Sequence, residues 1–412
     1  MNFEDLNLEY ELLDALDDMG FVKATPIQEQ AIPIILNNKD LLACAQTGTG
    51  KTGAFVLPIV NKLIFKMTPG VDTIIMVPTR ELAVQIEQQI QGFSYFVQVE
   101  SMAVYGGGSG ADYTTERRAL KNGVDIIVAT PGKLLSHLKL GHINLDNLKH
   151  FVLDEADRML DMGFIEDLQT IISYLPKDRQ TLLFSATMPK AIGAFAKKIL
   201  KQPEEIALAL SKPAEGVDQK LYLTYDAQKI PVLSHLLKER KHYDSIIVFT
   251  STKSKVSEIT RNLKSNGFPA RWISSSLEQE EREEVMRKFR AKRIRILVAT
   301  DVISRGIDIK DINLVVNFDV PHDPADYVHR VGRTARANTK GEAITFVNPK
   351  DMFKFSKIEK LIERELEKLN PPEEFGAAPE WKASKTKKKR YKKPYRKPKK
   401  KSASTPKNPK TN

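Results

Sequence analysis

Residues 45–52 have the types and spacing of a loop that binds phosphate groups. They read Ala-Gln-Thr-Gly-Thr-Gly-Lys-Thr and lie between an apolar run at 40–45 and a stretch at 53–65 that is compatible with a helix. Glycines allow backbone N–H groups to turn inward around a triphosphate, and the positive end of the following helix attracts the same anion. The predicted ATP ligands in this loop are Gln46, Thr47, Gly48, Thr49, Gly50, Lys51 and Thr52.

Two residues of this loop have specific chemistry. Lys51 can reach the outer phosphates of ATP, and the hydroxyl of Thr52 can coordinate Mg²⁺. The general pattern has glycine at its first position, where this chain has Ala45. The alternative interpretation is a glycine-rich turn that binds nothing.

A second reactive group consists of acids at the end of an apolar run. Asp154 and Glu155 follow the run at 151–153, and Asp157 comes two residues later. Beside a phosphate loop, Asp154 can hold the metal through water, and Glu155 can orient or deprotonate the attacking water. The alternative is a cluster of acids that stabilises the start of a helix. The presence of Lys51 upstream favours the catalytic interpretation.

Parallel sheets would bring these groups together. Apolar, β-rich runs alternate with stretches of helical spacing, which is typical of parallel sheets covered by helices. The first set of predicted strands comprises residues 40–45, 73–77, 101–105, 125–129, 150–153, 181–184 and 205–208. The second set comprises residues 220–225, 245–250, 270–273, 295–299, 314–318 and 343–347. We predict domains at 1–210 and 218–369, joined by a linker at 211–217 that contains Pro and Gly and has little to bury.

Basic residues are concentrated near the C-terminal end of the chain. The net charge of the 412 residues is +12, and residues 382–410 contain fifteen Lys or Arg and no Asp or Glu, which leaves −3 for residues 1–381. Because aliphatic side chains are nearly absent from residues 370–412, we predict a disordered tail. Interleaved Tyr and Pro favour a nonspecific nucleic-acid tether, with a solubilising tail or a contact with an acidic protein as alternatives.

Cysteine content and apolar runs restrict the class of protein. The single cysteine, Cys44, excludes a disulfide within the chain and a cysteine-based metal cluster. Residues 1–13 are acidic, and the apolar runs are too short to cross a bilayer, so we expect a cytoplasmic protein with no membrane contact.

The motifs of this chain, and their order along it, resemble those of the DEAD-box ATP-dependent RNA helicases over about residues 3–350. The first-domain motifs are Gly-Phe at 20–21, Thr-Pro-Ile-Gln at 25–28, Pro-Thr-Arg-Glu-Leu-Ala at 78–83, Gly-Gly at 106–107, Thr-Pro-Gly-Lys at 130–133, Asp-Glu-Ala-Asp at 154–157 and Ser-Ala-Thr at 185–187. The second-domain motifs are Val-Phe-Thr-Ser at 248–251, Gln279 with Arg282, Ala-Thr-Asp at 299–301, Arg-Gly-Ile-Asp at 305–308 and His-Arg-Val-Gly-Arg-Thr-Ala-Arg at 329–336. The chain is most similar to the bacterial RhlE-like group.

The resemblance implies two tandem RecA-like domains and further residues that act on ATP. Phe21, Thr25 and Gln28 would form an adenine-reading element, in which the ring of Phe21 stacks on the base and the amide of Gln28 pairs with its edge. Asp308 would hold the ribose.

The second-domain motif at 329–336 would complete catalysis. Arg333 and Arg336 would bring guanidinium groups to the γ-phosphate when the domains close. His329 would bridge to the residues that couple hydrolysis to strand separation, which are Asp157, Ser185 and Thr187. Solvated or ion-paired arginines and a packed histidine are the alternatives.

For RNA, the resemblance implies a bent single strand held across both domains with little sequence specificity. The predicted RNA-binding residues are Arg80, Gly107, Thr130, Gly132, Thr250, Gln279, Arg282 and Thr300. Each could instead be a turn residue or helix cap. Lys133 stands where the family has Arg, Ser274 and Ser275 replace His-Gly, and Ala335 replaces Gly.

These observations predict an RNA-dependent ATPase that uses ATP and Mg²⁺ to open short RNA duplexes or remodel RNA–protein complexes. An ATP-gated RNA clamp or scaffold is the first alternative, and a DNA translocase of the wider helicase superfamily is the second. Ribosomal or RNA-decay proteins are the partners that we expect besides RNA.

Overall fold

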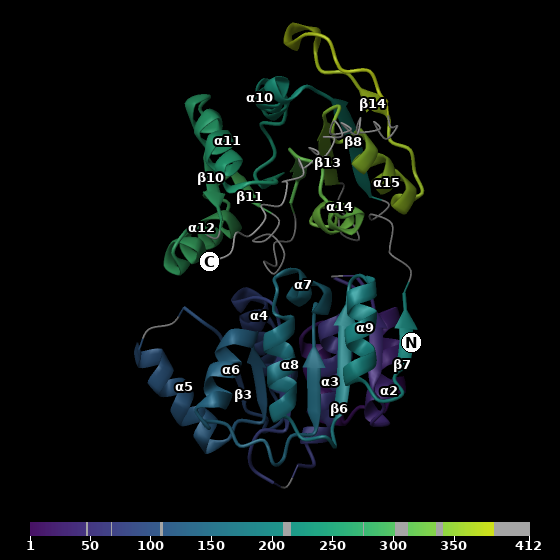
Figure 1. The fold of residues 1–412 in the computed structure, drawn as a ribbon, viewed down its shortest axis with the longest axis vertical. Helices are drawn as coiled ribbons and strands as arrows, with labels where there is room; N and C mark the ends of the chain where they lie inside the picture. Colours follow the sequence, from purple (N-terminus) through teal and green to yellow (C-terminus); the bar gives the residue numbers. More distant parts are fainter. Residues whose placement is uncertain are drawn as a thin grey trace, which may run out of the picture.

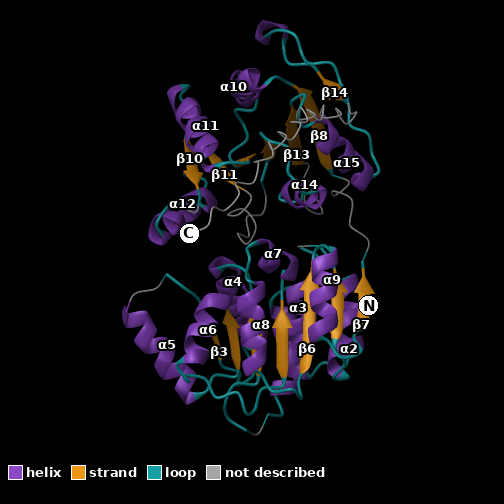
Figure 2. Ribbon diagram, in the orientation of Figure 1, coloured by secondary structure: helices purple, strands orange, loops and turns teal. Residues whose placement is uncertain are grey.

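The computed structural model of the protein describes residues 1–46, 48–66, 68–107, 110–208, 216–274, 276–300, 312–334 and 341–382, apart from the side chains of residues 110–112, 122 and 279. Within these residues the chain forms two α/β domains, each built on a parallel sheet of seven strands (Figures 1 and 2). The first domain ends with β7 and the second begins with β8. The predicted fold class is therefore confirmed.

The first sheet has the strand order β3-β4-β2-β5-β6-β1-β7. Its strands are β1 (Leu41–Cys44), β2 (Thr73–Met76), β3 (Ser101–Val104), β4 (Ile126–Ala129), β5 (His150–Leu153), β6 (Gln180–Ser185) and β7 (Glu204–Ala207). The predicted strands of this domain agree with these bounds to within one residue. Short apolar runs identify them well because central parallel strands are buried on both faces.

Helices cover both faces of the first sheet. One face packs against α1 (Tyr10–Asp18), α2 (Pro26–Leu36), α3 (Lys51–Leu63) and α4 (Arg80–Phe93), with η1 (Phe3–Leu6) beside them. The other face packs against α5 (Gly110–Asn122), α6 (Pro131–Lys139), α7 (Ala156–Asp161), α8 (Ile165–Tyr174) and α9 (Lys190–Ile199).

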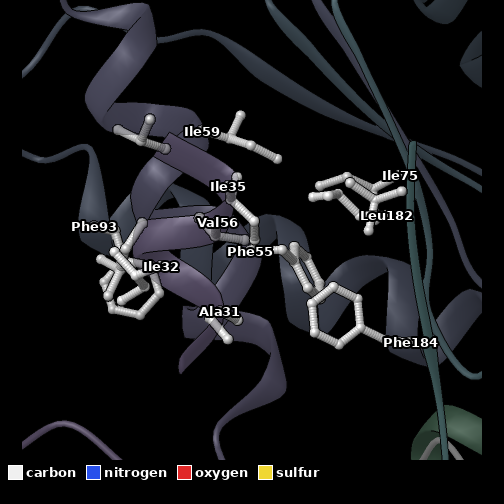
Figure 3. Packing of buried hydrophobic residues seen from close by; sticks show 14 of the residues in the cluster. Ala31, Ile32, Ile35, Phe55, Val56, Ile59, Ile75, Phe93, Leu182 and Phe184 are labelled. Atoms are coloured by element: carbon white, nitrogen blue, oxygen red, sulfur yellow. The ribbon is translucent and has the colours of Figure 1, made fainter. Parts of the chain in front are cut away.

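Aromatic and branched aliphatic side chains fill the core on the first of these faces (Figure 3). Phe55 of α3 lies against Phe184 of β6, with 5.2 Å between ring centroids. Ile32 and Ile35 of α2 belong to the same cluster. This packing fixes the start of α3, which carries the phosphate loop, relative to the sheet.

The second sheet has the strand order β10-β11-β9-β12-β13-β8-β14. Its strands are β8 (Val217–Leu223), β9 (Ile246–Thr250), β10 (Ala270–Ile273), β11 (Ile296–Thr300), β12 (Leu314–Asn317), β13 (Gly341–Val347) and β14 (Lys368–Leu369). Helices α10 (Lys229–Glu239) and α11 (Lys253–Ser265) share one apolar cluster with the sheet. Helices α12 (Gln279–Arg290), α14 (Pro324–Val331) and α15 (Met352–Ile362) belong to two others. The short helices η2 (Asp226–Gln228) and η3 (Glu373–Phe375) complete the domain.

The predicted start of the second domain is wrong, and one of its strands was not predicted. Strand β8 begins at Val217, inside the predicted linker, because it pairs with β13 from that residue onward. Residues 209–215 lie outside the described residues. The strand β14 was not predicted, and its two residues pair with β8 at the edge of the sheet.

The segment at 370–382, predicted as the start of a disordered tail, packs on the second domain. The side-chain amide of Gln228 donates to the carbonyls of Phe375 at 2.8 Å and Ala377 at 3.1 Å. Trp381 packs against the cluster around α15, and the ammonium of Lys368 lies 5.1 Å from its ring centroid. Phe375 and Ala378 also pack against apolar clusters of the second domain. The scarcity of aliphatic residues in this segment therefore did not indicate disorder. The predicted tail at 383–412 lies outside the described residues.

None of the described helices is both long and apolar enough to cross a lipid bilayer.

Candidate functional site

The strand order of the first sheet separates two groups of predicted site residues. The carboxyl ends of parallel strands meet at one edge of the sheet, where α/β proteins bind ligands. The phosphate loop and the motifs at 154–157 and 185–187 follow β1, β5 and β6. The motifs that resemble RNA-contacting segments follow β2, β3 and β4, on the other half of the same edge. The fold therefore places the predicted nucleotide-binding and RNA-binding residues on adjacent halves of one sheet edge.

The phosphate loop has a backbone suited to an anion. Gly48 and Gly50 have φ values of 85° and 92°, which a residue with a side chain adopts only with strain. Gly50 is the N-cap of α3, so the first backbone N–H groups of that helix face the loop. Lys51 is buried and donates from Nζ to the carbonyl of Ala45 at 2.9 Å. Half-buried Thr52 follows it, and Thr47 lies outside the described residues.

The predicted adenine-reading element packs directly on this loop. Gln28 Nε2 donates to the carbonyl of Gly50 at 3.1 Å, and Gln28 Oε1 accepts from the backbone N–H of Thr25 at 2.8 Å. A Cβ at Gly50 would lie 2.8 Å from Gln28 Nε2, so the contact requires glycine there. Phe21 contacts Phe93 edge-on, with 5.7 Å between centroids.

Gln28 differs from the expectation because its side-chain oxygen and nitrogen are both hydrogen-bonded within the protein. The side chain is buried and stabilises the phosphate loop through its hydrogen bond to the Gly50 carbonyl. Reading an adenine edge would require Gln28 to exchange these bonds. Its role toward the base remains a prediction, whereas its support of the loop is a feature of the fold.

Asp154 and Glu155 follow β5 at the centre of the edge. Burial raises the pKa of Asp154 to about 6, against the opposing effect of the Lys51 charge. A buried carboxylate next to a phosphate loop is the oxygen donor that Mg²⁺ requires, and the cation would compensate the charge. The donors in this region therefore fit a magnesium nucleotide.

Glu155 has an unusual backbone for a residue with a side chain. It is the N-cap of α7 with φ 51° and ψ 48°, and its N–H donates to Asp154 Oδ1 at 2.9 Å. Left-handed conformations of this kind cost energy and occur often at functional sites. The turn presents the Glu155 carboxylate at the cleft between the domains.

The three predicted coupling residues contact one another. The backbone N–H and the hydroxyl of Thr187 donate to Asp157 Oδ2 at 2.9 Å and 2.7 Å. The hydroxyl of Ser185 donates to the carbonyl of Thr187 at 2.7 Å and accepts from the N–H of Asp157 at 3.3 Å. A change at the acidic motif can therefore reach the segment after β6 through one hydrogen-bond network.

A cavity of about 600 Å³ lies between the two domains. Glu155, Asp157 and Thr187 line it from the first domain, and His329 of α14 and Arg333, just after that helix, line it from the second. In Figure 1, α7 lies at the end of the first domain that faces α12 and α14. The structure thus brings the acidic and Arg-containing motifs to one space. Asp308 and Arg336 lie outside the described residues.

The predicted RNA-binding residues of the first domain lie at the carboxyl ends of three neighbouring strands. Arg80 begins α4, and its guanidinium lies 4.4 Å from the ring centroid of Tyr105. Gly107 has φ 94° and is exposed. Thr130 is the N-cap of α6 and Gly132 is exposed in its first turn. Backbone N–H groups at these positions can bind phosphates without reading sequence.

The second-domain residues differ in accessibility. Thr250 is fully buried, and its hydroxyl donates to Asp319 Oδ2 at 2.8 Å, so this hydroxyl is occupied within the protein. Thr300 ends β11 and is nearly buried. Arg282 lies on α12, and the side chain of Gln279 is not described. The expected direct contact through the Thr250 hydroxyl does not fit this geometry.

Two of the predicted RNA-binding arginines pair with acids across the cleft. Arg80 Nη2 lies 2.9 Å from Glu283 Oε1, and Arg282 Nη2 lies 2.6 Å from Glu81 Oε1. The N-terminus of α4 therefore faces α12 of the other domain. An RNA phosphate that bound either arginine would compete with one of these carboxylates.

Sequence reasoning missed three residues near the site. Arg158 forms an ion pair with Glu155, and Glu283 forms one with Arg80. Asp319 accepts hydrogen bonds from several chain segments. The spacing of Arg158, three residues after Glu155 at a helix start, was a readable signal. The other two contacts join segments that are distant in sequence, so nothing in the local pattern indicated them.

Family models and related proteins agree on the kind of protein. A model described as DEAD/DEAH box helicase matches residues 25–195, and one described as helicase conserved C-terminal domain matches residues 228–338. The DEAD-box ATP-dependent RNA helicase CshA of Geobacillus kaustophilus is 42% identical over 371 residues, which cover 90% of this chain and 78% of the relative. CshA of Bacillus subtilis is 41% identical over 373 residues, covering 90% and 74%.

Solved structures show the same two-domain fold. The structure of S. cerevisiae Dbp5 bound to RNA and ADP BeF3 has a TM-score of 0.79 at 33% identity, covering 90% of this chain and 96% of that chain. A DEAD box protein from Methanococcus jannaschii has a TM-score of 0.52 at 40% identity, covering 90% and 99%. The relatives named CshA give the predicted RhlE-like grouping no support. On the identity and coverage of these relatives, the chain belongs to the DEAD-box family of ATP-dependent RNA helicases.

Proposed function

We propose that the protein hydrolyses ATP when RNA closes its two domains, and that closure opens short RNA duplexes or remodels RNA–protein complexes. One observation carries this proposal. Glu155 of the first domain and Arg333 of the second line the same cavity. A site divided between two domains is complete only while they are together, so ligands that favour closure control turnover.

The roles within the nucleotide site follow from the chemistry of its residues. Lys51 and the glycine backbone would hold the phosphates of ATP, and Thr52 and Asp154 would hold Mg²⁺. Bound magnesium nucleotide supplies the phosphoryl group and the metal charge. Glu155 orients and deprotonates the attacking water, while Arg333 and Arg336 stabilise charge on the leaving phosphate. Phe21, Gln28 and Asp308 would bind the base and the ribose.

RNA would lie along the edge formed by Arg80, Gly107, Thr130 and Gly132, and would reach Arg282 of α12. Glycine N–H groups, a helix N-terminus and arginines recognise the backbone and give little sequence specificity. The likeness to a structure of Dbp5 bound to RNA supports RNA binding by this fold. The segment at 383–412 would tether RNA nearby.

An ATP-gated RNA clamp remains a distinct alternative because it uses the same closed state. The two functions separate when short RNA duplexes are unwound with ATP while the lifetime of the RNA complex is measured with a nonhydrolysable ATP analogue. The proposal predicts strand separation and rapid release after hydrolysis. Long-lived complexes that accumulate without strand separation would identify a clamp.

A DNA translocase is disfavoured by the adenine-reading element at 25–28 and the motif at 185–187. RNA-stimulated ATP turnover should therefore exceed stimulation by DNA of the same sequence. Equal stimulation by both would favour the translocase. We also propose a cytoplasmic location and partners among ribosomal or RNA-decay proteins. Crosslinking to RNA in cells followed by sequencing would identify the RNAs that the protein binds, and ribosomal or decaying transcripts among them would support this role.

A further inference from the structure

The Glu155 carboxylate is paired with a neighbouring arginine on its own helix. Arg158 Nη1 lies 3.2 Å from Glu155 Oε2, and the two residues are three apart at the start of α7. Both side chains are nearly buried, with 6% and 11% of their surfaces exposed. Arg158 also lines the cavity between the domains.

Burial makes this pair different from an exposed pair on a helix surface. Exposed ion pairs contribute little because water screens them and both side chains stay mobile. A buried carboxylate has few alternative partners, and charge-assisted hydrogen bonds hold their geometry well. The Arg158 guanidinium therefore restricts the rotamers that the Glu155 side chain can adopt.

The backbone supplies only part of the precision that Glu155 needs. Its left-handed conformation and its N–H bond to Asp154 fix Cα, but rotation about the side-chain bonds can still move the carboxylate. Among the described residues, the Glu155 carboxylate bonds through Oε2 only. Oε1 therefore remains for a water molecule.

We propose that Arg158 is a positioning residue for Glu155. It holds one carboxylate oxygen so that the other faces the water that attacks the nucleotide. This inference rests on the proposed role of Glu155. A misplacement of about 1 Å at a reacting group can cost on the order of a hundredfold in rate. Arg158 thus acts on turnover rather than on nucleotide binding.

The test compares Arg158→Gln and Arg158→Lys with the parent chain in RNA-stimulated ATP hydrolysis. Arg158→Gln should lower kcat about tenfold or more, while KM for ATP and the half-saturating RNA concentration stay within about twofold. Arg158→Lys should recover much of the turnover, because an ammonium at the same position still donates to Oε2.

Arg179→Gln is the matched control. Arg179 is also partly buried in the first domain, but its Nη1 donates to the carbonyl of Pro176 before β6, at the sheet edge opposite the site. This variant should retain the parent kcat. Loss of turnover in Arg179→Gln equal to that in Arg158→Gln would show a general structural effect and overturn the inference.

Two further results would overturn the positioning role. Unchanged kcat in Arg158→Gln would show that Glu155 does not need the arginine. Parallel losses of kcat, ATP affinity and thermal stability, without recovery in Arg158→Lys, would assign Arg158 to the fold alone. Glu155→Gln is measured in the same series. If it also kept full turnover, the proposed role of Glu155 itself would fail, which separates the two claims.

Discussion

Asp154 and Glu155 are adjacent in sequence, yet their carboxylates have different surroundings. Asp154 is fully enclosed beside Lys51, and its raised pKa reflects a buried charge that a metal ion would compensate. Glu155 faces the cavity and pairs with Arg158. One acid is therefore suited to holding a cation and its neighbour to acting on water. The turn at Glu155, with its positive φ, separates the two environments.

The proposed roles of Lys51 and Glu155 predict different phenotypes for substitutions at these two residues. Lys51→Ala should abolish ATP binding, because the proposed role of the lysine charge is to hold the phosphates. Glu155→Gln should bind ATP like the parent, stop hydrolysis and remain closed on RNA. Binding of a fluorescent nucleotide and single-turnover hydrolysis measure the two properties. Parental turnover in Glu155→Gln would contradict the assignment.

Asp319 is a buried carboxylate that organises the second domain. Its Oδ2 accepts from the backbone N–H and the hydroxyl of Ser251 at 2.9 Å and 2.8 Å, and Lys255 Nζ lies 2.8 Å from Oδ1. Buried Lys229 lies 3.2 Å from the same oxygen. Burial alone raises the pKa of Asp319, but the bonds from Lys255 and Ser251 and the charge of Lys229 bring it well below its ordinary value.

A carboxylate whose pKa is lower in the folded than in the unfolded state stabilises the fold. This contribution is complete above the unfolded pKa of about 3.9 and is lost as pH falls through the folded pKa. Asp319→Asn should therefore lower the free energy of unfolding by about 3 kcal/mol at pH 7. The difference from the parent should persist at pH 5 and shrink below about pH 4.

Both tryptophans, Trp272 and Trp381, belong to the second domain, so urea unfolding followed by tryptophan fluorescence reports on Asp319→Asn directly. Thr345→Val, at a buried position on the neighbouring strand β13, controls for general damage to the sheet. A difference that stayed constant from pH 7 to pH 3 would contradict the ionic explanation.

At the scale of elements, thirteen of the fourteen described strands were predicted, and the two-residue edge strand β14 was not. The runs at 150–153 and 314–318 match β5 and β12 because strands buried on both faces are largely apolar. Strand β14 has two half-buried residues and is defined by pairing with β8, a contact that no local pattern encodes. The prediction of disorder at 370–382 was wrong for the same reason, because contacts with distant parts of the second domain hold this segment.

The candidate site shows a similar division. Motif spacing placed Lys51, Asp154 and Thr187 on the correct strand ends, because each motif carries its own local geometry. The pairings of Arg80 with Glu283 and of Gln28 with Gly50 depend on how elements pack, so sequence alone did not predict them. Resemblance to a family supplied the roles, whereas the fold supplied the partners.

The ion pair between α4 and α12 predicts how α12 influences RNA binding. Glu283→Gln should lower the RNA concentration for half-maximal ATPase by about two- to threefold, because Arg80 no longer exchanges a carboxylate for phosphate. Glu284→Gln is the matched control, since Glu284 pairs with Lys288 on the same helix at 2.5 Å. Weaker RNA binding in Glu283→Gln alone would show that the pair stabilises the RNA-bound arrangement instead.

At the scale of the whole molecule, the basic C-terminal segment is separate from the two folded domains in sequence and composition. Residues 383–412 contain fourteen Lys or Arg, and Lys382 is tied to the second domain through its N–H, which lies 3.2 Å from Met352 Sδ. A chain that ends at Lys382 therefore removes the basic segment and keeps Trp381 packed. This design isolates the electrostatic contribution of the tail.

Removal of residues 383–412 should weaken RNA binding and raise the RNA concentration for half-maximal ATPase. Each phosphate that the segment neutralises contributes about 0.7 to the logarithmic salt slope for a single strand, so the slope should flatten. Turnover at saturating RNA should match the parent. A full-length chain with the same Lys and Arg changed to Gln controls for length. An unchanged slope would reject the tether.

The proposal that the two domains share one catalytic site is tested most directly at Arg333, which lies on the domain opposite the phosphate loop. The decisive measurement is RNA-stimulated ATP turnover together with nucleotide affinity for the parent, Arg333→Ala and Arg333→Lys. We predict that Arg333→Ala lowers kcat about a hundredfold or more while nucleotide affinity changes less than about threefold, with little recovery in Arg333→Lys. Parental turnover, or equal losses of turnover and affinity, would contradict catalysis by domain closure.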